Sequence, residues 1–393
     1  MSHARMRPLL DELRARLEEI DSAGLHRSLV EPRGIDFSSN DYLGLASHPR
    51  LREAILESLR EGPLSAPASR LLRGTLPEHR DLEEKLARFK GVEACLLFPS
   101  GYQANLGLLS ALIGPRDRVI SDEANHASII DALRLSRCEK VVIPHLDAGA
   151  LEDALRVKPE AGRNFIVTES LFSMDGDVAP LDLYADLADR HGASLIVDDA
   201  HATGVYGPAR GSGLAETFQM ERRAAAIVST CGKALGLSGA FVGGSSTLVD
   251  YLINKSRAFI FSTAISPLLL AGIDAALDIV AAEPERRART LALAARLRRL
   301  LGAGGVDCAR SEGPIVPVVL GENERALRVA EVVRRRGHDV RAIRPPSVAE
   351  GTARLRISVH ADHTEEQIEG LAAAVLDGAR TAGAGAFTEA APG

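Results

Sequence analysis

The apolar residues in the first two thirds of the chain fall into short runs, each followed by a polar or glycine-rich turn and then by a helical segment. Several runs are apolar on both faces, which is typical of strands covered by helices on each side. Strands that alternate with helices favour an α/β fold with a largely parallel sheet. The pattern therefore predicts a three-layer α/β/α domain around a mostly parallel, seven-stranded sheet. Its strands are expected at residues 92–98, 117–123, 139–145, 164–170, 193–199, 225–230 and 240–245.

The pattern changes after Pro267, where a long helical stretch with an arginine-rich part (residues 286–301) leads to a smaller strand–helix–strand region at about 310–377. This change predicts a smaller C-terminal α+β domain. A tail rich in Ala and Gly follows, and we expect it to be disordered. The predicted organisation is an N-terminal helix and arm, a large domain, a small domain and the tail, at residues 1–45, 46–275, 276–380 and 381–393.

Charge and hydropathy exclude several classes of protein. The first 20 residues form a charged amphipathic pattern without the apolar run of a signal peptide. The most apolar later stretch, residues 267–282, is interrupted by Asp274 and Asp278 and is too short to span a bilayer. A net charge of −6 argues against nucleic-acid binding. We therefore expect a cytoplasmic protein that binds neither nucleic acid nor membrane.

The four cysteines lie far apart and form no CxxC pair, which indicates reduced thiols and neither a disulfide framework nor a zinc site. No metal site is expected. The cysteines are Cys95, Cys138, Cys231 and Cys308.

Polar residues follow the predicted strands at the edge where open α/β sheets bind ligands. Each has an ordinary structural explanation when taken alone: Ser and Gly often begin helices, and a single histidine is more often structural than catalytic. Together they include a lysine, an aspartate, two histidines and a helix N-terminus suited to a phosphate. The residues are Ser100, Gly101, Tyr102, Asn125, His126, Ser173, Asp198, His201, Thr230 and Lys233.

This combination fits a pyridoxal phosphate site better than a nucleotide site. Such a site needs a lysine for a Schiff base, an acid for the pyridinium nitrogen and an anion cradle. Lys233, between glycine-rich turns, would be desolvated enough to lose its proton. The run "GKALG" is not a phosphate loop, and no GxGxxG follows a strand, which argues against a Rossmann dehydrogenase.

Eight stretches, in order along nearly the whole chain, resemble the α-oxoamine synthases, a family of fold-type I pyridoxal phosphate enzymes. The resemblance implies the fold-type I transferase fold, with a seven-stranded large domain and a smaller C-terminal domain. The stretches are "DFSSNDYLGLASHP", "FPSGYQANLG", "NHASIIDALRLS", "ESLFSMDGDVAPL", "VDDAHATGVYG", "STCGKALGLSGAFVGGSS", "FIFSTAISP" and "GTARLRISVHADHT".

The resemblance implies a role for each matching residue around the cofactor. Lys233 would carry pyridoxal 5'-phosphate and act as the base at the substrate Cα, and Asp198 would keep the ring nitrogen protonated. His201 would bind the phenolic oxygen, and His126 would stack on the ring. The backbone N–H groups of Gly101 and Tyr102, together with Ser173 and Thr230, would complete the cofactor contacts. Asp199 matches no family role, and we expect it to anchor its loop.

The resemblance also implies residues for the substrates and the partner subunit. Ser262 or Thr263 would reach the phosphate of a second subunit, which implies a homodimer with a shared active site. Strand alternation in "TARLRISV" places Arg354, Arg356 and Ser358 on one face. Arg356 would clamp the substrate α-carboxylate, although a solvated arginine on an edge strand would be the default interpretation without the resemblance.

Two further positions, Asn40 and Thr352, match family positions near the substrate. The family's N-terminal arginine for the acyl carboxylate falls on His26 or Arg27, and Arg27 is the candidate.

The expected reaction is a decarboxylating condensation of L-alanine with a pimeloyl thioester. The segment that follows Lys233 is closest to the branch of the family that forms 8-amino-7-oxononanoate in biotin synthesis. The alternatives within the family are the glycine C-acetyltransferase (2-amino-3-ketobutyrate ligase), 5-aminolevulinate synthase and serine palmitoyltransferase branches. An alternative of another class is a non-catalytic scaffold with the same fold. The sequence does not choose between coenzyme A and an acyl carrier protein as the thioester carrier.

Overall fold

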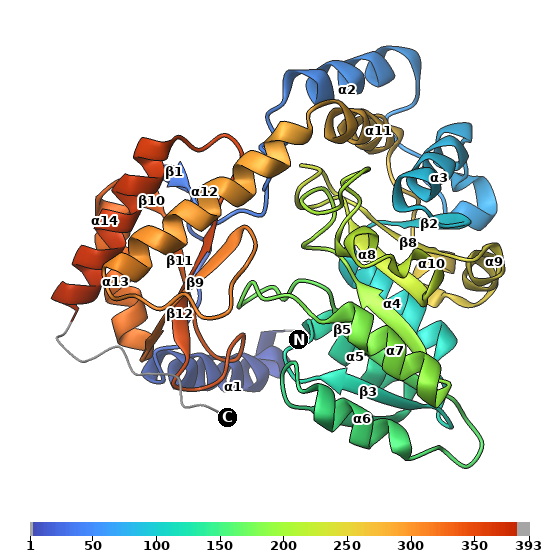
Figure 1. Ribbon diagram of the computed structural model, residues 1–393, viewed down its shortest axis with the longest axis horizontal. Helices are drawn as coiled ribbons and strands as arrows, with labels where there is room; N and C mark the ends of the chain where they lie inside the picture. Colours follow the sequence, from blue (N-terminus) through green and yellow to red (C-terminus); the bar gives the residue numbers. More distant parts are fainter. Residues whose placement is uncertain (1–2, 383–393) are drawn as a thin grey trace.

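The structure is a computed structural model that describes residues 3–382, and side chains from residue 8 onward. Two lobes are visible in Figure 1, one built on a large sheet and one on a small sheet, with helix α12 (Pro284–Ala303) running along the smaller lobe toward the larger. The tail expected to be disordered lies outside the described residues from residue 383 onward.

All seven predicted strands form one sheet with the order β2-β8-β7-β6-β5-β3-β4. Only β8 is antiparallel to its neighbours, so the prediction of a mostly parallel sheet is confirmed. The strands are β2 (Ala94–Phe98), β3 (Arg118–Asp122), β4 (Glu139–Ile143), β5 (Asn164–Glu169), β6 (Ser194–Asp198), β7 (Ala224–Thr230) and β8 (Ala240–Gly244).

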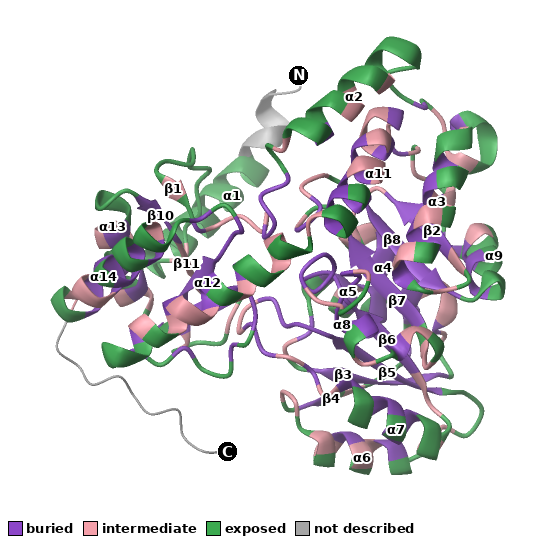
Figure 2. Cartoon of the chain, turned by 45° about the horizontal axis from the view of Figure 1, so that its top comes forward, coloured by how far each residue is buried: buried purple, intermediate pink, exposed green. Residues whose placement is uncertain are grey.

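Helices cover both faces of this sheet because successive strand residues point to opposite sides. In β2, Cys95 and Leu97 join one apolar cluster, and Leu96 and Phe98 join another. The sheet is thus buried between two layers, as the colours of Figure 2 show. The first layer contains α3 (Pro77–Lys90), α6 (Ala148–Arg156), α7 (Leu181–His191) and α11 (Pro267–Ala282), and the second contains α4 (Gly101–Leu112), α5 (Ala127–Ser136), α9 (Ser246–Lys255) and α10 (Arg257–Ile260).

The smaller lobe is built on an antiparallel sheet with the order β11-β12-β9, which has its own apolar core. A strand of the N-terminal arm, β1 (Ile35–Asp36), pairs in parallel with β10 (His338–Asp339) and so belongs to this lobe. The domain boundaries given above stay predictions. The remaining elements of the lobe are β9 (Ile315–Gly321), β11 (Arg341–Ile343), β12 (Ala353–Ser358), α13 (Asn323–Arg335) and α14 (Glu365–Thr381).

The remaining elements connect or flank the lobes. The described part of α1 (His3–Ser22) is largely exposed, and α2 (Pro49–Glu61) packs on α11. Short turns form α8 (Leu214–Thr217), η1 (Arg70–Gly74) and η2 (Met220–Arg222). Within residues 3–382, no helix is long and apolar enough to cross a membrane, and no cluster of three or more His, Cys, Asp or Glu side chains could hold a metal ion.

The topology brings the predicted site residues to one edge of the large sheet. Strands β2, β3, β5, β6 and β7 are mutually parallel, so their carboxyl ends meet there. The arm and β12 come over the same edge, because Arg356 on β12 bonds to both Asn40 and Ser173. The candidate site therefore lies where the two lobes and the arm meet.

Candidate active site

Asp198 is a fixed carboxylate at the carboxyl end of β6. One oxygen, Oδ2, accepts a hydrogen bond of 2.7 Å from Asn105 Nδ2 on α4, and Oδ1 accepts one of 3.0 Å from the backbone N–H of Ala200. Asn105 is itself held by Ser128 Oγ at 3.0 Å. The carboxylate is buried and keeps one orientation, which suits a group that must hold a cationic ring nitrogen.

Lys233 follows β7 in a glycine-rich turn. Within the described part of the chain, its amino group has no hydrogen-bond or salt-bridge partner, although the site also holds acidic side chains. Burial lowers the pKa of Lys233, while the nearby Asp198 and Glu169 oppose that shift. A lysine that loses its proton more easily is suited to form a Schiff base.

Both predicted histidines lie near Lys233, and among the described residues neither forms an ion pair with a carboxylate. His201 is buried, and its Nδ1 lies 2.8 Å from Tyr42 Oη. Burial, followed by the charges of Lys233 and Arg356, holds the pKa of His201 well below its usual value. His126 caps α5, and its Nδ1 lies 2.7 Å from a serine hydroxyl. Burial lowers the pKa of His126 as well, and the charge of Asp198 opposes that shift, so both rings favour the neutral form more than a free imidazole does.

The N-terminus of α4 forms an anion cradle beside Thr230. Ser100 is the N-cap residue, and its hydroxyl accepts a hydrogen bond of 3.3 Å from the N–H of Gln103. A Cβ atom on Gly101 would lie 3.8 Å from Thr230 Oγ1, so the helix start and the end of β7 adjoin. The free N–H groups and dipole of such a helix end favour a phosphate. The side chain of Tyr102 turns away to Asp131, which leaves its backbone N–H for the cradle.

The segment with Ser262 and Thr263 lies next to this cradle within the same chain. Gln103 Nε2 donates to Ser262 Oγ at 3.3 Å, and Thr263 pairs with Ser69 through an isolated bridge. The loop 63–72 is also attached to the segment, because the N–H of Ala264 donates to Ala68 O at 3.0 Å.

Arg356 is a buried guanidinium without a carboxylate partner in the described chain. Its Nε donates to Ser173 O at 2.5 Å, and its Nη2 donates to Asn40 Oδ1 at 3.0 Å and to Tyr42 Oη at 3.4 Å. Nη1 donates to Ser358 Oγ at 3.0 Å. Because β12 is the central strand of its sheet, the interpretation of a solvated arginine on an edge strand is wrong.

A hollow of about 550 Å³ opens from the site. Its lining includes His126, Ser173 and Thr352, together with the ion pair between Arg354 and Asp175. Three predicted residues from separate parts of the chain thus share one cavity. It is of the size that binds small organic substrates.

His26 and Arg27 line a second hollow of about 620 Å³ between the arm and the small sheet. Arg27 Nη2 donates to Ser347 Oγ at 3.3 Å, and Ser347 lines both hollows. The two candidates therefore remain side by side, next to the first cavity.

Asp199 anchors its surroundings, as expected from the sequence. Its Oδ2 lies 2.6 Å from Lys90 Nζ, and its Oδ1 accepts hydrogen bonds from Ser170 Oγ at 2.5 Å and from Leu214 N at 3.2 Å. Both members of the Lys90 pair are completely buried. Asp199 is therefore fully engaged in holding the residue 211–215 loop to β6.

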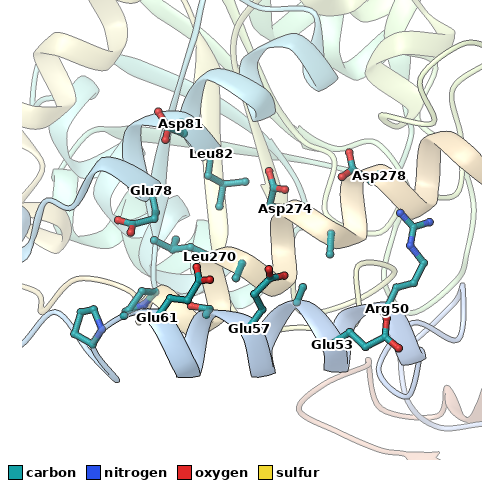
Figure 3. A pocket seen from close by; sticks show the side chains of 17 residues that line it. Arg50, Glu53, Glu57, Glu61, Glu78, Asp81, Leu82, Leu270, Asp274 and Asp278 are labelled. Carbon is teal, nitrogen blue, oxygen red and sulfur yellow. The ribbon is translucent and has the colours of Figure 1, made fainter.

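A larger hollow, of about 810 Å³, lies between α2, α3 and α11 and contains none of the predicted site residues. Figure 3 shows acidic side chains from all three helices around it, two of which, Asp274 and Asp278, lie on α11. Lys85 pairs with both at 2.8 Å. Size alone therefore does not identify the active site of this molecule.

Comparison with known proteins identifies the family. Residues 32–375 match the model of the aminotransferase class I and II family. An 8-amino-7-oxononanoate synthase from Anaeromyxobacter dehalogenans is 47% identical, over 94% of this chain and 96% of its own length. The chain belongs to the aminotransferase class I and II family. The fold-type I transferase fold and the resemblance to α-oxoamine synthases are thereby confirmed.

Solved structures agree on the fold. A serine palmitoyltransferase from S. paucimobilis with a bound pyridoxal phosphate–myriocin aldimine superposes with a TM-score of 0.88, at 28% identity over 95% of this chain and 98% of that one. An 8-amino-7-oxononanoate synthase from Francisella tularensis superposes with a TM-score of 0.76, also at 28% identity, over 88% and 97%. Both solved structures are 28% identical to this chain, so they do not distinguish the palmitoyltransferase branch from the oxononanoate synthase branch. The relative with 47% identity is an 8-amino-7-oxononanoate synthase and favours that branch.

The cofactor is pyridoxal phosphate, and the residues present fit it. An unpaired lysine, a fixed carboxylate and a helix N-terminus beside Thr230 supply the three kinds of group that the cofactor needs. Sequence reasoning missed three residues here: Tyr42, Asn105 and Glu169. All three lie inside the matched stretches. Glu169 is also the last residue of β5, so the rule of inspecting strand ends could have found it.

Proposed function

We propose that this chain catalyses the decarboxylating condensation of L-alanine with a pimeloyl thioester. The products would be 8-amino-7-oxononanoate, carbon dioxide and a free thiol, in a step of biotin biosynthesis. The 47% identity to an 8-amino-7-oxononanoate synthase over nearly the whole chain supports this reaction and the acyltransferase class. The observation that carries the proposal is the buried Arg356, whose charge no carboxylate of the described chain neutralises, at the mouth of a lysine–aspartate–histidine site.

Each predicted residue of the site is assigned a role around the cofactor. When bound, pyridoxal phosphate supplies an electron sink for negative charge at the substrate Cα. Lys233 would hold it covalently, and the free amino group would then take the Cα proton of L-alanine. Asp198 would keep the ring nitrogen protonated, and His201, oriented by Tyr42, would donate to the phenolic oxygen. His126, at the wall of the cavity, would cover the ring face.

Phosphate and substrate contacts complete the assignment. Gly101 and Thr230 adjoin at the helix N-terminus that would hold the phosphate. Arg356 and Asn40 would bind the amino acid carboxylate, because a guanidinium offers paired donors in the geometry of a carboxylate. Ser173 and Thr352, which line the same cavity, would contact the cofactor and the substrate respectively.

The acyl group would extend from this cavity toward Arg27, past the shared wall at Ser347. We also propose a homodimer whose Ser262 or Thr263 reaches the neighbouring subunit's phosphate, as the resemblance to the α-oxoamine synthases implies; Thr263 is exposed in this chain. The location of such an enzyme would be the cytoplasm.

The test is the visible absorbance of the purified protein with pyridoxal phosphate, titrated separately with L-alanine, glycine and L-serine. A lysine–cofactor band that responds at low L-alanine concentration, followed by product formation with pimeloyl-coenzyme A, is the expected result. A preference for L-serine would support the palmitoyltransferase branch instead, and a preference for glycine the acetyltransferase or aminolevulinate branch. Absence of any band would refute the role of Lys233. The Arg356→Lys enzyme is the control, because it should keep the band and lose the response to L-alanine.

A further inference from the structure

Glu169 is a buried acidic side chain that none of the assigned roles uses. It is the last residue of β5, and its Cα pairs in register with that of Asp198 on β6. Glu169 is 2% exposed, and its Oε1 atom has no hydrogen-bond partner. The wall of the site therefore carries two neighbouring carboxyl groups, one fully hydrogen-bonded and one with a free oxygen.

Several charged and hydrogen-bonding groups act on Glu169 from the elements around it. Asp198 and Lys233 act on it most strongly, and the backbone N–H groups of His126 and Ser173 approach it from the ends of β3 and β5. The charge of Glu169 also raises the pKa of Tyr42, which lies on the arm. The charge of Arg356 acts on both Lys233 and Tyr42, and the charges of Lys233 and Arg356 act on His201.

Two buried carboxylates side by side repel each other, so one of them favours its protonated form. Burial, and then the charge of Asp198, raises the pKa of Glu169 to about 8. Each oxygen of Asp198 accepts a hydrogen bond, from Asn105 and Ala200. Glu169 also accepts from the backbone N–H groups of His126 and Ser173, but its Oε1 is left without a donor. The unpartnered Oε1 is therefore the favoured position for a proton.

The charge on Glu169 matters because it bears on Lys233. A carboxylate near an amino group favours the ammonium form, and both Asp198 and Glu169 act in that direction on Lys233. No carboxyl oxygen lies within 4.0 Å of Lys233 Nζ in the described chain, so no ion pair fixes the proton there. The protonation of Glu169 then decides whether Lys233 faces one negative charge or two.

We propose that Glu169 is a positioning residue of the cofactor site that carries a proton in the resting enzyme, so that Asp198 is the only fixed anion beside Lys233. This inference rests on the proposed function, because it assigns Lys233 the cofactor. A neutral Glu169 allows Lys233 to release its proton more easily.

The experiment compares the loaded wild-type enzyme with Glu169→Gln, because an amide reproduces a protonated carboxyl in shape and charge. The absorbance of the lysine–cofactor linkage is titrated from pH 6 to 10, and cofactor affinity is measured by equilibrium titration. Glu169→Gln should bind pyridoxal phosphate within about threefold of wild type, since a neutral hydrogen-bonding group is retained. Wild type should show a second titration component near pH 8 that Glu169→Gln lacks.

The matched control is Glu123→Gln, which makes the same change at an exposed carboxylate on the rim of the same cavity and should titrate like wild type. The proposal is overturned if Glu169→Gln lowers the pH midpoint of the linkage by a full unit or weakens cofactor binding more than about tenfold, because both indicate a lost negative charge. Should Glu169→Gln not fold, a single-component titration of wild type alone overturns it. Absence of the band from wild type would instead refute the proposed function.

Discussion

Lys90 and Asp199 form a buried ion pair, and Asp199 lies two residues before His201 in the chain. Breaking this pair tests how the site is held in place. Both side chains are fully buried, with Nζ and Oδ2 2.6 Å apart. Asp199 also accepts from Ser170 Oγ and Leu214 N, while Lys90 donates to a backbone oxygen at 2.5 Å. The pair thus joins α3, β6 and the loop before α8, and its loss should loosen all three.

Asp199→Asn keeps the shape of the side chain but leaves the Lys90 ammonium buried without its counterion. Removing one member of a buried ion pair costs about 3–5 kcal/mol of folding free energy. Replacing both, as Lys90→Met with Asp199→Leu, removes the stranded charge and should recover at least about 1–2 kcal/mol relative to the sum of the single changes. An exposed pair on the same helix, Glu84 with Arg88, should contribute less than about 1 kcal/mol.

The assay is urea unfolding followed by circular dichroism at the helix band, since the chain contains no Trp to serve as a fluorescent probe. Asp199→Asn should shift the unfolding midpoint strongly and Glu84→Gln barely. The reasoning would be refuted if Asp199→Asn unfolded within about 0.5 kcal/mol of wild type, the range of ordinary surface substitutions. Strict additivity in the double variant would refute the coupling.

Three further outcomes are expected. Arg356→Gln should raise the KM for L-alanine by about 100-fold or more, because a charge-assisted pair is lost, and steady-state kinetics with an unchanged KM would contradict this. Tyr42→Phe should lower kcat/KM about 5-fold to 20-fold, because one buried hydroxyl is missing. Full activity of this variant would show that the Tyr42 hydroxyl has no role in the site. Burial lowers the pKa of His145, but hydrogen bonds to Asp122 and Asp177 raise it to about 10. The stabilisation is complete below the unfolded value near 6.5 and disappears as pH rises through 10, so His145→Gln should flatten the fall of stability between pH 7 and 10 in chemical denaturation.

The sheet and its ligand edge could be predicted because both depend on local patterns. Each strand of the large sheet is a short run rich in Val, Ile, Leu and Ala, and period-two burial then follows from the pleat. Parallel strands bring their carboxyl ends together, so Asp198, Thr230 and Lys233 could be placed at one edge without coordinates. The roles of these residues came from the resemblance, since no local pattern distinguishes a Schiff-base lysine from another lysine in a turn.

Contacts between distant segments could not be predicted in the same way. Tyr42 reaches His201 across 159 residues of sequence and Arg356 across 314, and no periodicity encodes such pairs. Asp199 was expected to anchor its loop, but its partner Lys90, at the end of α3, is 109 residues away in the chain and could not be predicted. Glu169 was missed because an acid at a strand end usually reaches solvent, and only burial next to Asp198 makes it unusual.

The contacts of Arg356 suggest why the arm belongs to the smaller lobe. A guanidinium has five N–H donors, and those of Arg356 face Ser173 O, Ser358 Oγ, Asn40 Oδ1 and Tyr42 Oη. A carboxylate that binds in bidentate fashion must therefore replace at least one of these contacts, and the longest, at 3.4 Å, is to Tyr42. Because the pairing of β1 with β10 and the bonds to Asn40 fix the arm to the lobe that carries Arg356, the exchange of partners occurs within a preformed pocket. A carboxylate that bound there as proposed would meet a guanidinium whose position is already fixed. The cost of binding would then lie in the displaced contact and not in ordering the chain.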